Sequence, residues 1–294
     1  MGNHEVCMDP RTSQNYDFLY CPSLPAAIIF SALFGLTAIV HSIQAIHYRK
    51  GFCWVIIMGG LWETAGFILR VYNVMDTTSS AYQIPSQLLI LLSPLWINAF
   101  LYVLMSRMVH FFVPEKHVGG INARRLSLCF VLLDITAFLV QAVGGTMIGN
   151  DDDPKTALLG IHIYMGGIGL QQFFVLGFIG LVIRFHYKMK RLDGSTEWKR
   201  PLYIMYISLV LITVRIVFRL IEFSSGVFSS ITMHEAPFYC LDALPMFAAL
   251  FLWNIFHPGQ VLVGPESEFP KKEKKSKKGE KDLEALDLLR APTP

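Results

Sequence analysis

Apolar residues in this chain gather in seven long runs, separated by short polar connections. Each run has about 20 residues or more, the length that an α-helix needs to cross the hydrocarbon core of a bilayer. The pattern predicts an all-α integral membrane protein with seven transmembrane helices. These cover roughly Pro22–Ile46, Phe52–Tyr72, Gln83–Phe112, Leu126–Gly149, Ala157–Phe185, Leu202–Phe223 and Ala236–His257.

The composition supports this interpretation. Hydrophobic residues make up 53% of the 294 residues and charged residues only 16%, whereas soluble domains have about 25% charged residues. Fifteen of the 47 charges follow Gly264, so the rest of the chain is poorer in charge still. This composition excludes a soluble globular protein. The second and sixth runs are the weakest assignments, because both carry charged residues.

Lys and Arg are distributed unevenly between the connections. Alternate connections and the C-terminal tail hold 18 of them, while the N-terminal segment and the remaining connections hold two. Because positively charged connections stay in the cytoplasm, we expect the N-terminus outside and the C-terminus inside. The expected organisation is an extracellular segment (1–21), a seven-helix transmembrane domain (22–259) and a disordered, Lys-rich cytoplasmic tail (260–294).

The tail has a run of seven Lys and two Glu within residues 271–281. Such a run is typical of disorder and serves as a topological and solubilising signal. It would also attract anionic lipid of the inner leaflet, by about 1 kcal/mol for each basic residue near the surface. We expect membrane lipids and amphiphilic small molecules as partners, no nucleic acid, and the plasma membrane as the location.

The sixth run contains a stripe of charge. Arg215, Arg219 and Glu222 are spaced i, i+4 and i+7, so they share one face of the predicted helix. An ionised side chain in hydrocarbon costs roughly 2.5 kcal/mol or more. The stripe must therefore face protein or water, and other helices must supply its partners.

Polar residues of other helices fall at a similar depth, in the outer half to the middle of the predicted bilayer. Glu63 and Arg70 share a face of the second helix, and Glu235, Tyr239 and Asp242 repeat the i, i+4, i+7 spacing in the seventh. Together with residues of the third to sixth helices they form the predicted substrate-binding set. Its members are Glu63, Arg70, Gln87, Gln141, His162, Gln171, Arg215, Arg219, Glu222, Glu235, Tyr239 and Asp242.

The charges of this set do not balance. Three cations (Arg70, Arg215 and Arg219) meet four acids, or five if Asp134 of the fourth helix also faces them. We expect Arg219 to pair across helices, because Arg before Glu222 is the poorer orientation along one helix. A fully paired network would be structural. Surplus acid would accept a cationic headgroup or a proton, and the three Arg would suit a phosphate or carboxylate; the sequence leaves these alternatives open.

Metal and cofactor motifs are absent from the sequence. No two His lie at ligand spacing on one helix, and there is neither H-E-x-x-H nor C-x-x-C. We therefore expect no metal, no cofactor and no catalytic residue. A disulfide among Cys7, Cys21 and Cys240 is open, since all three would lie outside. Ser93-Pro94, Leu244-Pro245 and Gly144-Gly145 predict kinks or close helix contacts.

A series of short motifs occurs in a fixed order along the chain. They are Tyr20-Cys-Pro-Ser23, His41, Glu63-x-x-Gly66-x-x-x-Arg70, Tyr82, Gln87, Leu-Leu-Ser-Pro94, Tyr102, Arg107, Asp134, Gln141-Ala-Val-Gly-Gly145, Gly160, Gly169-Leu-Gln-Gln172, Arg215-x-x-x-Arg219-x-x-Glu222, Gly226, Glu235-x-x-x-Tyr239-x-x-Asp242 and His257-Pro-Gly259. By this ordered set the chain resembles the fungal lipid-translocating exporter family, the RTA-like seven-helix membrane proteins, from about Tyr20 to Gly259. Ile216 and Thr146 depart from the Ser and Gly often found there, and neither departure changes a charge.

The resemblance implies a fungal membrane protein that exports or flips lipids. Relatives are associated with sphingoid long-chain bases, with resistance to toxic amphiphiles and, in one branch, with porphyrin uptake. We therefore expect a transporter or floppase of amphiphiles rather than an enzyme, and the sequence has no nucleotide-binding G-x-x-x-x-G-K-[ST] motif.

Two other functions stay open at this point. Seven helices with the N-terminus outside is also the layout of a receptor or sensor of lipid ligands, which ligand-stimulated signalling would reveal. An intramembrane lipid hydrolase would need a metal, which metal analysis of the purified protein would detect.

Overall fold

The computed structural model describes residues 22–76, 80–149, 154–192, 196–224, 234–264 and 269, and the structural statements below concern these residues. Within them, seven helical spans are long and apolar enough to cross a membrane. The helices are α1 (Leu24–Tyr48), α2 (Trp54–Met75), α3 (Ser80–Phe112), α4 (Ala123–Gly149), α5 (Pro154–Arg191), α6 (Lys199–Ser224), α7 (Ala236–Phe238) and α8 (Leu244–Ile255). The seventh span is composite, because the π-helical turn η2 (Tyr239–Ala243) joins α7 to α8. The predicted seven-span, all-α membrane fold is confirmed.

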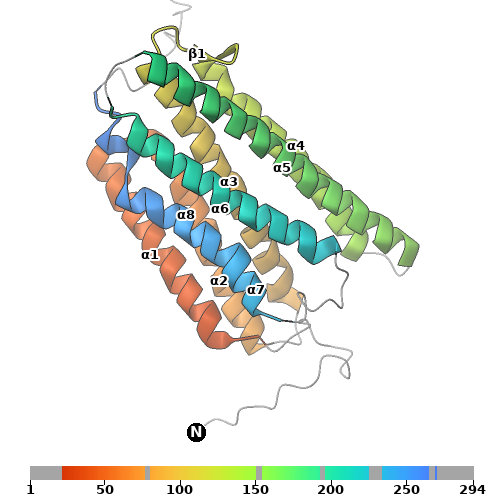
Figure 1. The fold of residues 1–294 in the computed structure, drawn as a ribbon. Coiled ribbons are helices and arrows are strands. Elements are labelled where there is room, and N and C mark those ends of the chain that lie inside the picture. The colour runs from red at the N-terminus through yellow and green to blue at the C-terminus, as the bar shows by residue number, and fades with distance from the viewer. Residues whose placement is uncertain are drawn as a thin grey trace, which may run out of the picture.

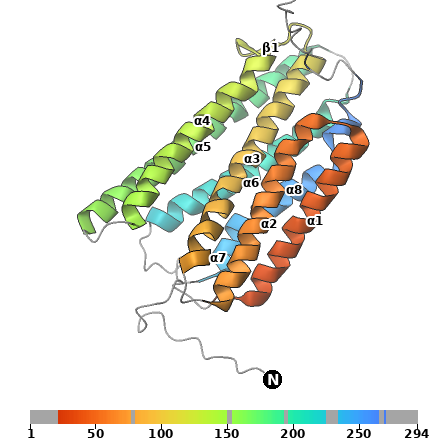
Figure 2. The same ribbon diagram turned by 180° about the vertical axis from the view of Figure 1, so that it is seen from behind.

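The helices pack in chain order and the bundle closes on itself. Each of α1 to α5 packs on the next helix, α6 packs on α8, and α8 packs back on α1. Figures 1 and 2 show α4 and α5 side by side along one flank, with α1 and α2 on the opposite flank. We call the end where α1 begins the α1-start end. The other end carries the hairpin of β1 (His117–Val118) and β2 (Ile121–Asn122), and we call it the hairpin end (Figure 1).

Short elements and polar caps fix the helix ends. At the α1-start end the Ser23 hydroxyl caps α1 by accepting from the Ala26 N–H at 3.4 Å. At the hairpin end the turns η1 (Gly51–Cys53) and η3 (Pro258–Gln260) flank α2 and α8, and the His257 ring stacks on Tyr48 with centroids 4.6 Å apart.

Helix α5 extends beyond the apolar run that predicted it. The fifth run ends at Phe185, but α5 continues to Arg191, because hydropathy marks only the part of a helix that lies in lipid. In this extension Lys188 contacts the Glu115 carboxylate and donates to the His117 carbonyl at 3.2 Å. The extension therefore ties α5 to the hairpin connection between α3 and α4.

Close backbone contact joins α4 to α5, as the glycine pattern predicts. A Cβ added at Gly144 would lie 2.4 Å from the Tyr164 nitrogen, and one added at Gly167 would lie 2.6 Å from the Gln141 side chain. No side chain fits at such distances, so glycine is required where the two helices cross.

The surface of the bundle carries many large apolar side chains. Large side chains such as Ile46, Phe173 and Val210 are more than half exposed, while Phe34, Tyr102 and Trp253 are fully buried. In water this surface would be unfavourable, but lipid is a good solvent for it.

Some predicted features lie outside the described residues. They are the N-terminal segment, the Lys-rich tail (271–281), Cys7 and Cys21. Cys240 is described, and it is an exposed, free thiol.

Candidate functional site

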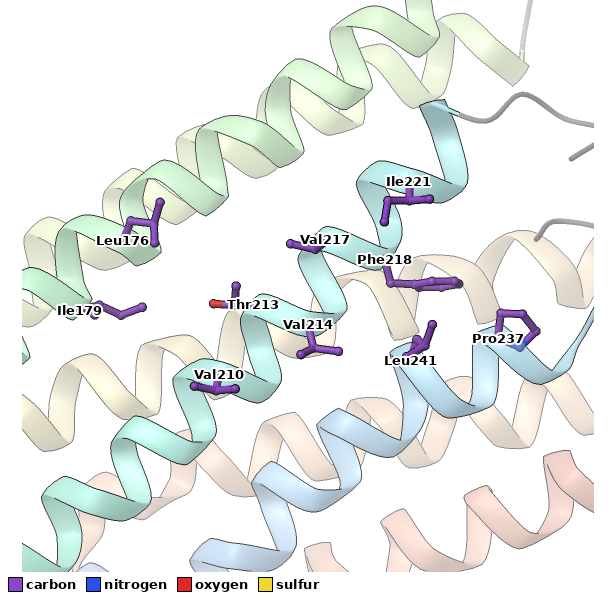
Figure 3. A pocket seen from close by; sticks show the side chains of 10 residues that line it. All are labelled: Leu176, Ile179, Val210, Thr213, Val214, Val217, Phe218, Ile221, Pro237 and Leu241. Atoms are coloured by element: carbon purple, nitrogen blue, oxygen red, sulfur yellow. The ribbon is translucent and has the colours of Figure 1, made fainter. Parts of the chain in front are cut away.

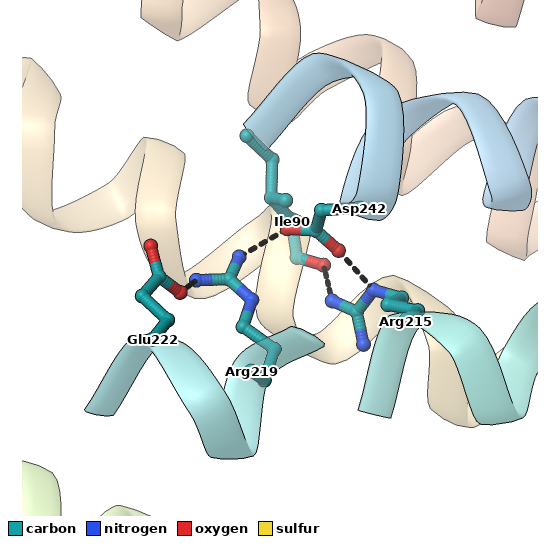
Figure 4. Close-up of polar contacts among 5 residues, drawn as sticks. All are labelled: Ile90, Arg215, Arg219, Glu222 and Asp242. Carbon is teal, nitrogen blue, oxygen red and sulfur yellow. Dashed lines mark hydrogen bonds and ion pairs between the residues drawn. The ribbon is translucent and has the colours of Figure 1, made fainter. Parts of the chain in front are cut away.

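The charged stripe of α6 meets one acid of the seventh span. Arg215 and Arg219 both form ion pairs with Asp242, one with each carboxylate oxygen (Figure 4). The three residues are 4%, 7% and 1% exposed. Two guanidinium groups thus hold one carboxylate away from lipid and water, which fixes α6 against η2.

The backbone of α3 supplies a further partner for Arg215. Pro94 has no N–H, so the Ile90 carbonyl, four residues earlier, lacks its helical donor. Arg215 Nη2 fills that position and donates to the Ile90 oxygen at 3.2 Å. The proline in this helix therefore leaves a free acceptor, and the arginine donates to it.

Asp242 is presented by an irregular turn. It lies in the five-residue π-helix η2, whose end is closed by the Leu244 N–H donating to the Tyr239 carbonyl. Pro245 follows at the start of α8. Single π turns change the direction of a side chain relative to a regular helix, and they occur often at functional positions.

Arg219 also contacts Glu222 on its own helix, with Nη1 3.1 Å from Oε2. The sequence predicted pairing across helices, and Arg219 makes both contacts because the two ends of its guanidinium reach different acids.

A second ion pair lies toward the α1-start end. Arg70 Nη2 is 3.1 Å from Glu235 Oε1, and Arg70 Nε donates to the Tyr239 hydroxyl at 3.3 Å. The other Glu235 oxygen accepts from the Ser23 backbone N–H at 2.6 Å. The ring of Phe238 lies 4.3 Å from the Arg70 guanidinium and 5.9 Å from that of Arg219. Phe238 therefore separates the two charge clusters while stabilising both cations.

Glu63 differs from the other acids of the set. It is 1% exposed and interacts electrostatically with Arg215, Asp242 and Arg219, yet it makes no ion pair among the described residues. Its Oε2 is buried without a hydrogen-bond partner. The Ser93 side chain hydrogen-bonds to the Glu63 carboxyl group, and its hydroxyl also contacts the Gly59 carbonyl at 2.8 Å, so it is a shared partner that leaves Oε2 unsatisfied. Glu63 is thus the acid with an unused acceptor beside the network.

Two of the three predicted glutamines contact each other. Gln141 Nε2 donates to Gln171 Oε1 at 3.0 Å. With Tyr164, Arg215 and Arg219 they line a small void of about 10 Å³, which is close to the least volume that holds one water. This void marks the α4–α5 side of the network.

Two members of the predicted set lie outside it. Gln87 and His162 are exposed. On α3, Ser86 and Ile90 face the bundle, and Gln87 is one step of about 100° away from that face. On α5, Gly160 and Tyr164 face inward, so His162, between them in sequence, points outward.

Two features were missed by sequence reasoning. Asp134 does not face the arginines; it contacts Asn98 and Tyr102 of α3.

The second feature is a groove of about 560 Å³ between α5, α6 and the α7–η2 segment (Figure 3). Its lining is apolar apart from Thr213, whose hydroxyl donates to the Leu209 carbonyl at 2.8 Å. No sequence pattern marks the groove, because residues of several separate elements form it.

The buried histidines do not meet in one site. His41 Nε2 is 3.1 Å from the Leu250 carbonyl, and His257 Nδ1 accepts from the Gly259 N–H at 3.1 Å. Among the described residues no three His, Cys, Asp or Glu side chains are arranged to hold a metal ion.

Comparison with known proteins adds a family to this geometry. The chain is 43% identical to the probable lipid transporter atnI of Emericella nidulans, over 88% of this chain and 72% of that protein. It is 28% identical to the lipid-translocating exporter-like protein RTA1 of Leptosphaeria maculans, over 84% of this chain and 52% of that protein. It is 22% identical to the sphingoid long-chain base transporter RSB1 of Saccharomyces cerevisiae, over 85% and 75%. No solved structure matches the chain.

A family match covers most of the transmembrane part. Residues 56–264 match the family described as RTA1-like proteins, and they contain both ion-pair clusters, Glu63 and the apolar groove. On this match and on the 43% identity to a relative over 88% of this chain, the chain belongs to the RTA1-like protein family.

Proposed function

We propose that this protein moves lipids or single-chain amphiphiles across the membrane, and that cationic long-chain bases are among its substrates. Relatives that align along most of the chain carry the names of a lipid transporter and a sphingoid long-chain base transporter. The observation that carries the proposal for this chain is the buried, unpartnered oxygen of Glu63 beside a network whose other charged groups form ion pairs.

The charge balance of the network supports a cationic ligand. Arg215 and Arg219 are matched by Asp242 and Glu222, and Arg70 is matched by Glu235. Glu63 adds one acid without a cation of its own. A primary ammonium would supply both the charge and the hydrogen-bond donor that Glu63 lacks. A neutral analogue would supply neither, so it should bind more weakly.

The apolar groove supports a place for the hydrocarbon tail. Phe218 and Leu241 line it, and their sequence neighbours Arg219 and Asp242 belong to the network. One face of α6 therefore presents charge to the interior, while the adjacent face presents an apolar groove (Figures 3 and 4). A single-chain amphiphile needs both kinds of surface.

The test uses purified protein in liposomes. Wild-type protein should move a labelled long-chain amine across the bilayer without ATP, and E63Q should abolish movement while remaining folded. E115Q is the matched control, because Glu115 is exposed and lies outside the spans. In cells, overexpression should confer resistance to sphingoid bases through wild-type protein but not through E63Q. Protein that binds such an amine and changes its loop accessibility, but moves no lipid, would be a receptor instead.

The same proposal places the protein in the plasma membrane, with the N-terminus outside, the C-terminus and its Lys-rich tail (271–281) in the cytoplasm, and no enzymatic activity. The Lys- and Arg-rich connections after α1, α3 and α5 support this orientation. A tag inserted within 224–230 should be labelled on intact cells, and a tag after Pro270 only after permeabilisation. Labelling in the opposite sense would overturn the orientation. Hydrolysis of a lipid substrate by metal-loaded protein would overturn the assignment as a non-enzyme.

A further inference from the structure

A second buried acid lies between α3 and α4, apart from the arginines. Asp134 is 2% exposed. Its Oδ2 accepts two hydrogen bonds, from Asn98 Nδ2 at 3.0 Å and from the Tyr102 hydroxyl at 2.9 Å. Among the described residues Asp134 makes no ion pair, and Tyr102 is the titratable group that contacts it. The two partners that this carboxyl group contacts, an amide and a phenol, are therefore both neutral.

Two acceptors at this contact lack a donor. Asp134 Oδ1 and Asn98 Oδ1 are both buried without a hydrogen-bond partner. An amide can donate to one carboxyl oxygen and accept from the other when that other oxygen carries a proton. A proton on Asp134 Oδ1 is thus the simplest addition, because it would supply a donor to Asn98 Oδ1.

The surroundings keep water away from the carboxyl group. The rings of Tyr102, Phe130 and Phe178 pack on one another, with centroid separations of 4.6 to 5.3 Å. Phe130 precedes Asp134 by one helical turn, and the fully buried Ala137 follows it by about one. An ionised carboxylate without a cation in such a place would be strongly destabilised, and a group in that position takes up a proton instead.

We infer that Asp134 is a proton-binding site, occupied in this conformation. Loss of the proton would leave a bare charge between α3 and α4, so the ionised form requires these helices to separate and admit water. Proton occupancy would therefore bias the protein between this packing and a more open one. This coupling of proton occupancy to helix packing rests on the proposed function and extends it, because lipid movement would then depend on pH.

Infrared spectroscopy tests the site directly, without any transport assay. In folded protein in lipid at neutral pH, the spectrum of wild type minus D134N should show the carbonyl band of a protonated carboxylic acid, shifted in deuterated water. E115Q, which changes an exposed carboxylate, should not remove that band. If D134N fails to fold, Y102F should shift the band by removing one donor to Oδ2. Absence of any such band in folded variants would overturn the inference.

A sodium ion is the competing occupant, since oxygen atoms line the site. If sodium, relative to choline, stabilised the wild type against heat and did not stabilise D134N, the site would hold sodium and the proton inference would be wrong. We expect sodium to have the same effect on both.

The pH dependence of transport is measured in a separate experiment. At about pH 6 and about pH 8, where a primary ammonium stays charged, the wild type should move the long-chain amine at rates that differ several-fold after subtraction of empty liposomes. D134N should move it at equal rates. Equal wild-type rates would remove the link to transport, and no movement at either pH would contradict the proposed function. The infrared result decides the proton site in either case.

Discussion

Two aspartates are buried in this bundle to nearly the same extent, and their surroundings are opposite. Asp242 is 1% exposed and holds two guanidinium groups. Asp134 is 2% exposed and holds an amide and a phenol. Burial alone therefore does not determine the charge of a carboxyl group in a membrane; its partners do. Asp242 therefore acts as a charged clamp between α6 and η2, whereas Asp134 makes a neutral contact between α3 and α4.

The largest effect should follow removal of the Asp242 charge. D242N leaves Arg215 without an ion pair and Arg219 with Glu222 alone, and breaking a buried pair from one side costs about 3–5 kcal/mol. The melting temperature of purified protein measures this loss. Adding R215Q should restore part of it, because it removes the cation that D242N leaves without an ion pair. Additive effects of the two substitutions would mean that the residues are not coupled.

The same substitution at Asp134 should be mild. D134N keeps the size of the side chain and offers an amide hydrogen where we infer a proton, so it should change the free energy of unfolding by less than about 1 kcal/mol. D134A leaves the Asn98 and Tyr102 donors unpaired and should cost about 2 kcal/mol. Thermal unfolding of both variants measures the contrast. If D134N is as damaging as D242N, Asp134 is ionised and the comparison fails.

The clamp needs the shape of Arg215 as well as its charge. In R215K one ammonium replaces a fork that reaches both Asp242 and the Ile90 carbonyl. Lys would keep the ion pair and leave the carbonyl without a donor, at a cost of about 1 kcal/mol. The measurement is again thermal unfolding, with K188R as a control at the exposed pair. Wild-type stability of R215K would mean that charge alone is sufficient.

The sequence predicts the layout of the bundle better than its contacts. Seven apolar runs specify seven spans, and the stripe of Arg215 and Arg219 specifies that one face of α6 is buried. Periodicity does not specify which neighbour a residue meets. Asp134 was a candidate partner for the arginines by depth alone, but its face of α4 packs on α3.

Depth misplaced two further residues for the same reason. Gln87 and His162 lie at the depth of the charge network, but on helix faces that point away from it, and they are exposed. The π turn at Asp242 could not be predicted, because it depends on one shifted backbone hydrogen bond. The acceptor at Ile90 could have been predicted, because Pro94 removes its helical donor.

The smallest effect should come from an ion pair outside the spans. Lys188 contacts Glu115, and its ammonium lowers the pKa of the exposed Glu115 carboxyl group below its ordinary value. A pKa lowered by folding stabilises the protein above the unfolded-state pKa, and the contribution disappears as the pH falls through the lowered value. Water and salt screen this pair, so E115Q should melt within error of the wild type at neutral pH, and any difference should vanish in acid. A large loss in E115Q would mean that ion pairs contribute equally inside and outside the membrane, and the contrast between Asp242 and Asp134 could then not be assigned to burial and partners.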